Sequence, residues 1–145
     1  MVIEIKNRPV YHEFFIDATY EAGMVLQGTE VKSLRSGRAS FNDSYCLIHK
    51  GEIWLKSLHI AEYTHGTVNN HDPVRDRKLL LEKREIKKIA AKLKEKGYTL
   101  VPLRIYFKER LAKIQIGLAK GKKLHDKRES IKQKDVEREM KRYLK

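Results

Sequence analysis

The chain has 145 residues, and 41% of them are hydrophobic, which is enough to build the core of one compact domain. It holds 32 Lys and Arg against 19 Asp and Glu, so its formal net charge at pH 7 is +13. Such a surface attracts polyanions and repels its own copies, so we expect a monomer that binds nucleic acid, with a membrane surface as the rival partner. No segment is apolar enough to span a membrane, and residues 1–10 lack the apolar core of a signal peptide. We therefore expect a cytoplasmic protein without membrane attachment.

The first half of the chain contains short apolar runs of the kind that form strands. Residues 11–17 are rich in aromatics and predict one strand, residues 24–26 predict a second, and Gly23 marks a bend or bulge between them. Residues 44–49 and 52–60 are separated by only a Lys-Gly pair, which predicts a hairpin whose glycine adopts a positive φ.

A short helix is expected between the first strands and this hairpin. Thr29 can cap it, Val31 and Leu34 lie three residues apart and share a face, and Gly37 can end it. Cys46 is the single cysteine, so no internal disulfide can form, and its apolar neighbours predict a buried thiol.

In the second half, residues 65–77 are polar and predict a long loop, where function is often found. An apolar stripe predicts a helix to about residue 97, formed by Ile86, Ile89, Ala90 and Leu93. Residues 101–107 and 112–118 alternate and predict a second hairpin. The predicted fold is mainly β with helices, namely an antiparallel β-barrel of the oligonucleotide-binding type with peripheral helices.

The composition changes near the C-terminus. Residues 119–145 include 11 basic and 5 acidic residues, and their apolar residues form no continuous stripe. They cannot offset the entropy of ordering this segment alone, so we expect it to be disordered until a partner binds. We place the barrel body at residues 1–124 and a basic tail at residues 125–145.

Enzyme signatures are weak in this sequence. Residues 117–123 resemble a phosphate-binding loop, but the glycine spacing is one residue short and no Ser or Thr follows the lysine. Only His65, His71 and Asp72 are close enough in sequence to suggest a metal site, and solvated side chains explain them better. We expect no catalytic residues, no metal and no cofactor.

Four blocks of residues, in order along nearly the whole chain, resemble the small protein B family of transfer-messenger RNA-binding proteins. They are the helix segment 28–35, Asp43-Ser44-Tyr45, residues 72–81 with Asp72-Pro73, and residues 119–128. The resemblance implies a body that binds the transfer-RNA-like domain of transfer-messenger RNA and delivers it to stalled ribosomes in trans-translation. It also implies a tail that probes the empty messenger channel and contacts small-subunit ribosomal RNA.

Site residues follow from these blocks together with their chemistry. Lys32 and Arg35 share a helix face that can meet phosphates, while Glu30 can orient an arginine or accept a hydrogen bond from RNA. The expected RNA-binding residues are Glu30, Lys32, Ser33, Arg35, Tyr45, Asp72, Arg75, Arg77, Lys78, Lys120, Gly121, Lys122 and Lys123. The expected ribosome-contacting residues of the tail are His125, Asp126, Lys127, Arg128, Lys132, Lys134, Arg138, Met140 and Lys141.

Two alternatives remain open at this point. The positive charge alone supports a general RNA chaperone or a structural ribosomal protein equally well. A metal-dependent nuclease built on Glu30, Asp72 and a histidine is motivated only by acidic residues that stand near basic ones.

Overall fold

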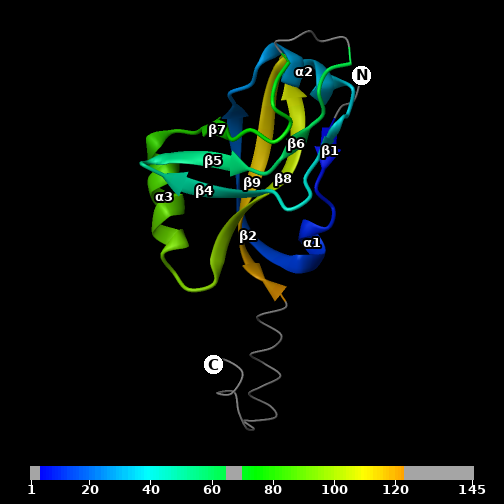
Figure 1. The fold of residues 1–145 in the computed structure, drawn as a ribbon. Coiled ribbons are helices and arrows are strands. Elements are labelled where there is room, and N and C mark those ends of the chain that lie inside the picture. Colours follow the sequence, from blue (N-terminus) through cyan, green and yellow to red (C-terminus); the bar gives the residue numbers. More distant parts are fainter. Residues whose placement is uncertain (1–3, 65–69, 123–145) are drawn as a thin grey trace.

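The computed structural model describes residues 4–64 and 70–122 (Figure 1). Within these ranges the chain forms, in order, β1 (Glu4–Lys6), α1 (Val10–Glu13), β2 (Phe14–Met24), α2 (Gly28–Arg35), β3 (Ala39–Ser40), β4 (Tyr45–His49), β5 (Glu52–Lys56), β6 (His59–Ile60), β7 (Arg77–Leu80), α3 (Lys83–Leu93), β8 (Tyr98–Lys108) and β9 (Leu111–Gly121). No helix in this part of the chain is long and apolar enough to cross a membrane.

The main sheet closes on itself. Seven strands pair in the order β1-β8-β4-β5-β7-β2-β9, every pairing is antiparallel, and β9 also pairs with β8. Six strands therefore form a ring, with β1 added outside β8. The β2–β9 and β8–β9 pairings run along most of each strand, whereas β4 and β8 meet at one register pair, Cys46 opposite Leu100. The predicted class, mainly β with helices, is confirmed, and the assignment to the oligonucleotide-binding type stays a prediction.

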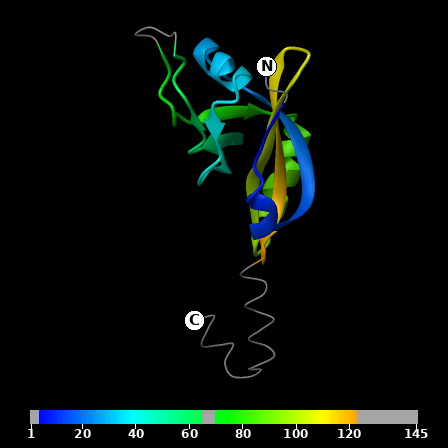
Figure 2. The ribbon, with the colours of Figure 1, turned by 90° about the vertical axis from the view of Figure 1, so that its right-hand side faces the viewer.

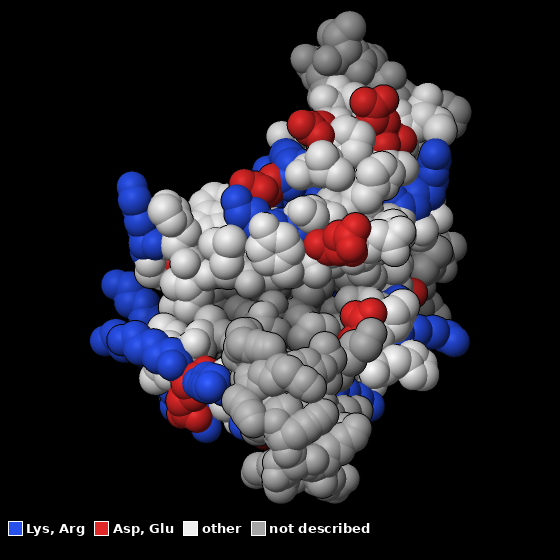
Figure 3. All heavy atoms as spheres, turned by 60° about the horizontal axis from the view of Figure 1, so that its bottom comes forward, with Lys and Arg blue, Asp and Glu red and all other residues white. Residues whose placement is uncertain are grey.

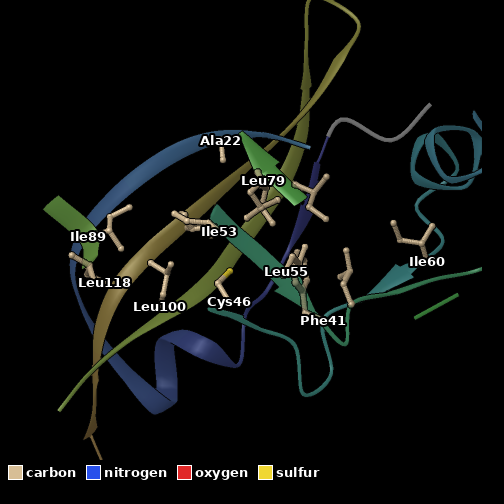
Figure 4. Packing of buried hydrophobic residues seen from close by; sticks show 14 of the residues in the cluster. Ala22, Phe41, Cys46, Ile53, Leu55, Ile60, Leu79, Ile89, Leu100 and Leu118 are labelled. Carbon is tan, nitrogen blue, oxygen red and sulfur yellow. The ribbon is translucent and has the colours of Figure 1, made fainter. Parts of the chain in front are cut away.

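The core lies inside this ring. Side chains from all six strands of the ring and from α3 point into it, including Ile53, Leu79, Ile89, Leu100 and Leu118, each at most 1% exposed (Figure 4). Cys46 belongs to the same cluster, so the buried thiol predicted from sequence is confirmed, and burial raises its pKa. Removal of this much apolar surface from water is the main stabilising contribution to the fold.

The turns explain where the strands stop. Lys50 and Gly51 both have positive φ, 53° and 77°, which gives the predicted two-residue hairpin turn between β4 and β5. Ser57 has a φ of 62°, and this left-handed residue breaks the single strand expected over 52–60 into β5 and β6. The second predicted hairpin is confirmed as β8 and β9, both longer than the alternating pattern indicated.

Three local predictions are wrong. Residues 11–13 are helical in α1, and β2 runs without a bend through Gly23, which pairs with Leu80 and Lys113. The disorder expected from residue 119 does not begin there, because Ala119 is fully buried and β9 continues to Gly121 between β2 and β8. The basic composition of this segment did not indicate the end of β9, because in a strand an exposed Lys120 can stand next to a buried Ala119.

Helix α3 is confirmed, with bounds shorter than predicted. Ile89 is fully buried, and Ile86 and Leu93 pack partly against the core. The helix ends at Leu93, and Gly97, with a φ of 89°, lies in the connection to β8.

Candidate nucleic-acid interface

Glu30 is the centre of an ion-pair network between α2 and the segment leading into β7. Its side chain is fully buried, and its Oε1 accepts hydrogen bonds from Arg75 Nη2 at 2.6 Å and from the Gln27 backbone N–H at 2.8 Å. Oε2 accepts from the Nε atoms of Arg75 and Arg77, at 3.0 and 2.8 Å. Of the two roles that the sequence left open, orienting an arginine is therefore the one that the structure gives to Glu30.

Arg77 belongs to the core. It is 0% exposed, and besides Glu30 it donates to the carbonyl oxygens of Leu58 and, at 3.0 Å, of Pro73. Ser33 is also buried, at 1% exposure. None of the side chains of Glu30, Ser33 and Arg77 reaches the surface in this conformation, and the RNA-binding role predicted for them stays a prediction. Arg75 differs, since 27% of its side chain is exposed.

The network keeps Glu30 ionised. Burial by itself would raise the pKa of this carboxyl, but the hydrogen bonds from Arg75, from the Gln27 backbone and from Arg77 outweigh it and hold the pKa below its ordinary value. Burial lowers the pKa of Arg77, and the hydrogen bond to Glu30 opposes that effect. An arginine stays charged throughout the physiological range, so the cluster is a buried, fully hydrogen-bonded ion pair.

Helix α2 is also connected, through His71, to β6 of the small β3–β6 sheet. This side chain is 3% exposed, with Nε2 at 2.9 Å from the Ile60 carbonyl oxygen and Nδ1 at 2.8 Å from the Thr29 hydroxyl. A carbonyl only accepts, so Nε2–H donates to Ile60, and Nδ1 forms its hydrogen bond with the Thr29 hydroxyl. Thr29 was expected to cap α2, but Gln27 holds the N-cap position.

This arrangement does not support Glu30 and Asp72 as the metal ligands of a nuclease. Both oxygens of Glu30 are occupied by guanidinium and backbone donors, and Asp72 Oδ1 accepts from the Val74 backbone N–H at 3.0 Å. In the part of the chain that the structure describes, no group of His, Cys, Asp or Glu is arranged to hold a metal ion.

The exposed face of α2 carries cations that lie on aromatic rings. Lys32 Nζ is 5.3 Å from the centre of the Tyr63 ring, and the Arg35 guanidinium is 5.3 Å from that of Phe107 on β8. Rings hold these cations near the surface without neutralising their charge, so they remain available to phosphates. Figure 2 shows α2 and the chain beyond β6 on one side of the barrel, with β2 on the other.

A second group of cations lies at the far end of β9, away from α2 (Figure 1). Lys120 Nζ is 4.7 Å from the Tyr98 ring centre, and Lys122 Nζ is 5.0 Å from that of Phe15 and donates to the Tyr11 carbonyl oxygen at 3.0 Å. We name Lys120, Lys122 and these three aromatic residues the β9 end. Cations and exposed rings together are what single-stranded nucleic acid binds.

The remaining predicted residues do not gather at one place. Tyr45 is exposed at the start of β4, and Lys78 forms an ion pair with Glu52 at 2.7 Å. Asp72 is exposed, and Gly121 has no atom within 4 Å of the position that a Cβ would occupy, so a close approach there is sterically open. Lys123 and the nine tail residues from His125 to Lys141 lie outside the described residues.

Sequence reasoning missed the basic face of α3. Figure 3 shows Lys and Arg gathered along the side of the molecule that carries this helix. The exposed cations there are Lys83, Arg84, Lys87, Lys88, Lys94 and Lys96. The signal was present, since 83 and 87, and 84 and 88, are spaced four apart opposite the apolar stripe.

The closed sheet carries exposed cations that lie on aromatic rings, and the buried Glu30 network supports α2. These features are typical of a small protein that binds polyanions. A family model described as "SmpB protein" matches residues 4–145. A curated relative from Geobacter sulfurreducens, "SsrA-binding protein", is 60% identical over 92% of this chain and 88% of its own length. A relative of the same name from Bacillus cereus is 54% identical over 94% of this chain and 88% of its own. The chain belongs to the SmpB family.

The solved structures agree. A chain from the structure described as "tmRNA-SmpB: a journey to the center of the bacterial ribosome" matches with a TM-score of 0.71 and 49% sequence identity. The match covers 83% of this chain and 85% of that one.

Proposed function

We propose that this chain binds the transfer-RNA-like domain of transfer-messenger RNA and delivers it to stalled ribosomes in trans-translation, as a non-catalytic cytoplasmic protein. The observation that carries the proposal is a family match over residues 4–145, with relatives named for binding SsrA RNA at 60% identity. The net charge of +13 and the exposed cation-ring pairs supply the affinity for phosphate that this role requires.

Within this proposal the predicted RNA-binding residues divide into two kinds. Those with exposed or half-buried side chains, together with Gly121, would contact RNA. They are Lys32, Arg35, Tyr45, Asp72, Arg75, Lys78, Lys120 and Lys122. Glu30 and Arg77 would act from beneath by holding α2 and Arg75 in place, whereas the buried Ser33 hydroxyl has no hydrogen-bond partner in the described residues. The body would span residues 1–124.

The tail, residues 125–145, would follow the body into the empty messenger channel of the small subunit. Its basic residues would contact ribosomal RNA phosphates there, and Met140 would act near its end. This part of the proposal rests on the resemblance and on charge alone.

The test is a competition assay with the full chain at physiological salt. Labelled transfer-messenger RNA is displaced by unlabelled transfer-messenger RNA or by ordinary transfer RNA, and we expect at least about a tenfold preference for the former. Equal competition by both RNAs would overturn the proposal and favour a general RNA chaperone. A magnesium-containing incubation of the same RNA, analysed on a gel, should leave it intact.

A further inference from the structure

An open cavity of about 600 Å³ lies between the segment from β1 to β2 and the segment from β3 to β4. Its apolar lining includes Val10, Phe14, Phe41 and Val101. Polar side chains from both segments also line it, namely Lys6, Glu13, Asn42, Asp43 and Tyr45. Neither the cations of α2 and α3 nor the β9 lysines contribute to this lining, so the cavity is distinct from the three basic surfaces described above.

Both walls are held by hydrogen bonds to the main chain. Asn7 Nδ2 donates to the Pro102 carbonyl oxygen at 2.8 Å and fixes the first segment on β8. On the other side, the Ser44 hydroxyl and backbone N–H donate to the Phe41 carbonyl oxygen at 2.6 and 2.8 Å. This turn places Asp43 in the left-handed region, with a φ of 59°. The cavity is therefore a preformed feature of the fold.

Two polar side chains of this turn, unlike Ser44, have no partner within the described ranges, 4–64 and 70–122. The carboxylate of Asp43 and the amide of Asn42 make no hydrogen bond or ion pair there. An ionised carboxylate is an acceptor with room for two donors at once. Beside it, Phe14 and Tyr45 supply aromatic lining and Lys6 supplies a cation.

One kind of ligand matches all of these features. An unstacked nucleobase has an apolar face for aromatic side chains and a polar edge for hydrogen bonds, and its phosphate suits a lysine. Guanine presents two adjacent donors, N1–H and N2–H, on its Watson–Crick edge, which suits a bidentate carboxylate. Adenine, cytosine and uracil each lack this pair of donors. The net charge of +13 favours the approach of RNA to the protein.

We propose that this cavity binds one unstacked guanine of a single-stranded RNA segment, with Asp43 accepting from the Watson–Crick edge of the base and Lys6 facing its phosphate. The proposal rests on the RNA-binding function proposed above and adds a base-reading subsite to it. A protein loop is the other conceivable occupant, but the basic field of the chain favours a polyanion.

The test uses the full chain, labelled with nitrogen-15, and three RNA pentamers that differ at the central base: UUGUU, UUAUU and UUUUU. We expect the amides of Thr99 and Val101, which also line the cavity, to shift on titration. The pentamer with guanosine should bind at least about tenfold more tightly than the other two. Equal affinity for all three, or shifts confined to surface lysines, would overturn the proposal.

The variant that isolates the base contact is D43N, because asparagine tolerates the left-handed backbone of this turn. It should lower the affinity for UUGUU by about tenfold and leave that for UUUUU unchanged. The matched control is E109Q, which also alters a carboxylate at a left-handed residue, with a φ of 50°, on the β8–β9 turn. An equal loss of affinity for UUGUU in both variants would mean that Asp43 acts only through its charge, and it would overturn base recognition.

The pentamer titration and the competition assay fail independently. A chain that prefers transfer-messenger RNA but binds the three pentamers equally has the proposed function without this subsite. A chain that selects UUGUU but does not distinguish transfer-messenger RNA from transfer RNA has the subsite without the proposed function.

Discussion

The Glu30 network and the β9 end are both built from cations that stand close together in the sequence, and the fold treats them in opposite ways. Arg77 is fully buried and directs its donors to one carboxylate and two carbonyl oxygens. Lys120 is exposed and rests on an aromatic ring. A basic motif can therefore be part of the core or part of a binding surface, and burial distinguishes the two. The contrast predicts that one region controls stability and the other controls RNA affinity.

The largest effect on stability should come from Arg77→Ala. The substitution leaves Glu30 buried with fewer donors and removes the guanidinium donor of the Leu58 carbonyl, while the Pro73 carbonyl keeps only the Ile60 N–H, so the free energy of unfolding should fall by about 3–5 kcal/mol. Urea denaturation followed by circular dichroism measures it. Arg84→Ala is the control, because within the described residues Arg84 forms only an exposed pair with Glu82, and it should change stability by less than about 0.5 kcal/mol. An unchanged midpoint for Arg77→Ala would contradict the structural role.

Glu30→Gln should cost less, about 2–3 kcal/mol at pH 7, because the amide keeps the shape and one acceptor but loses the charge. The pH dependence gives a second measurement. The pKa of Glu30 in the folded protein lies below its ordinary value of 4.5, so its stabilising contribution is present above that value and is lost as the pH falls through the lower, folded pKa. The stability difference between the native chain and Glu30→Gln should therefore shrink as the pH falls from about 6 to about 3. A difference that stays constant would contradict an ionised Glu30.

Charge reversal at the β9 end should change RNA affinity with little effect on folding. The double substitution Lys120→Glu and Lys122→Glu should weaken RNA binding by about tenfold or more. It should also reduce the slope of log affinity against log salt by about 1 for each phosphate that the protein no longer neutralises. The urea midpoint should stay close to that of the native chain. The matched control is Lys50→Glu with Arg110→Glu, two exposed turn residues outside the basic surfaces described above, where an equally large decrease in affinity would mean that total charge decides binding.

The smallest effect should come from Thr29→Val, which preserves shape and removes the hydroxyl that is hydrogen-bonded to His71. The buried Nδ1 then lacks its partner, so we expect a decrease of about 1 kcal/mol in the free energy of unfolding. RNA affinity should be unchanged, and a drop in affinity without a drop in stability would place Thr29 in the interface.

Regular patterns made much of the fold predictable. The stripe of α3 and the alternation in β8 and β9 each reflect a single buried face, so periodicity identified them. The turn at Lys50 and Gly51 follows from local chemistry. By contrast, the left-handed residue at Ser57 and the passage of β2 through Gly23 depend on pairing with strands distant in the sequence, which a local pattern does not contain.

The site was predictable in composition and less so in geometry. The sequence indicated that Glu30 can orient an arginine, and Arg75 and Arg77 were both singled out, but their pairing spans more than 40 residues. Alternation along β7 makes Arg77 and Leu79 face the same way, inward, and this was the available sign that Arg77 is buried. No pattern in the sequence predicted the cavity beside Asp43, because its two walls come from separate parts of the chain.

β4 and β8 are joined by a single register pair, Cys46 opposite Leu100, and this is the weakest pairing in the closed sheet. The other neighbours in the ring share from two register pairs, between β2 and β7, up to ten, so the ring should open first between β4 and β8, where Cys46 lies. Its thiol is buried and its raised pKa makes it unreactive while the ring is closed. The rate at which a thiol reagent modifies Cys46 therefore measures how often β4 and β8 separate. Cys46 is thus an intrinsic probe of this local opening, and no added label is needed.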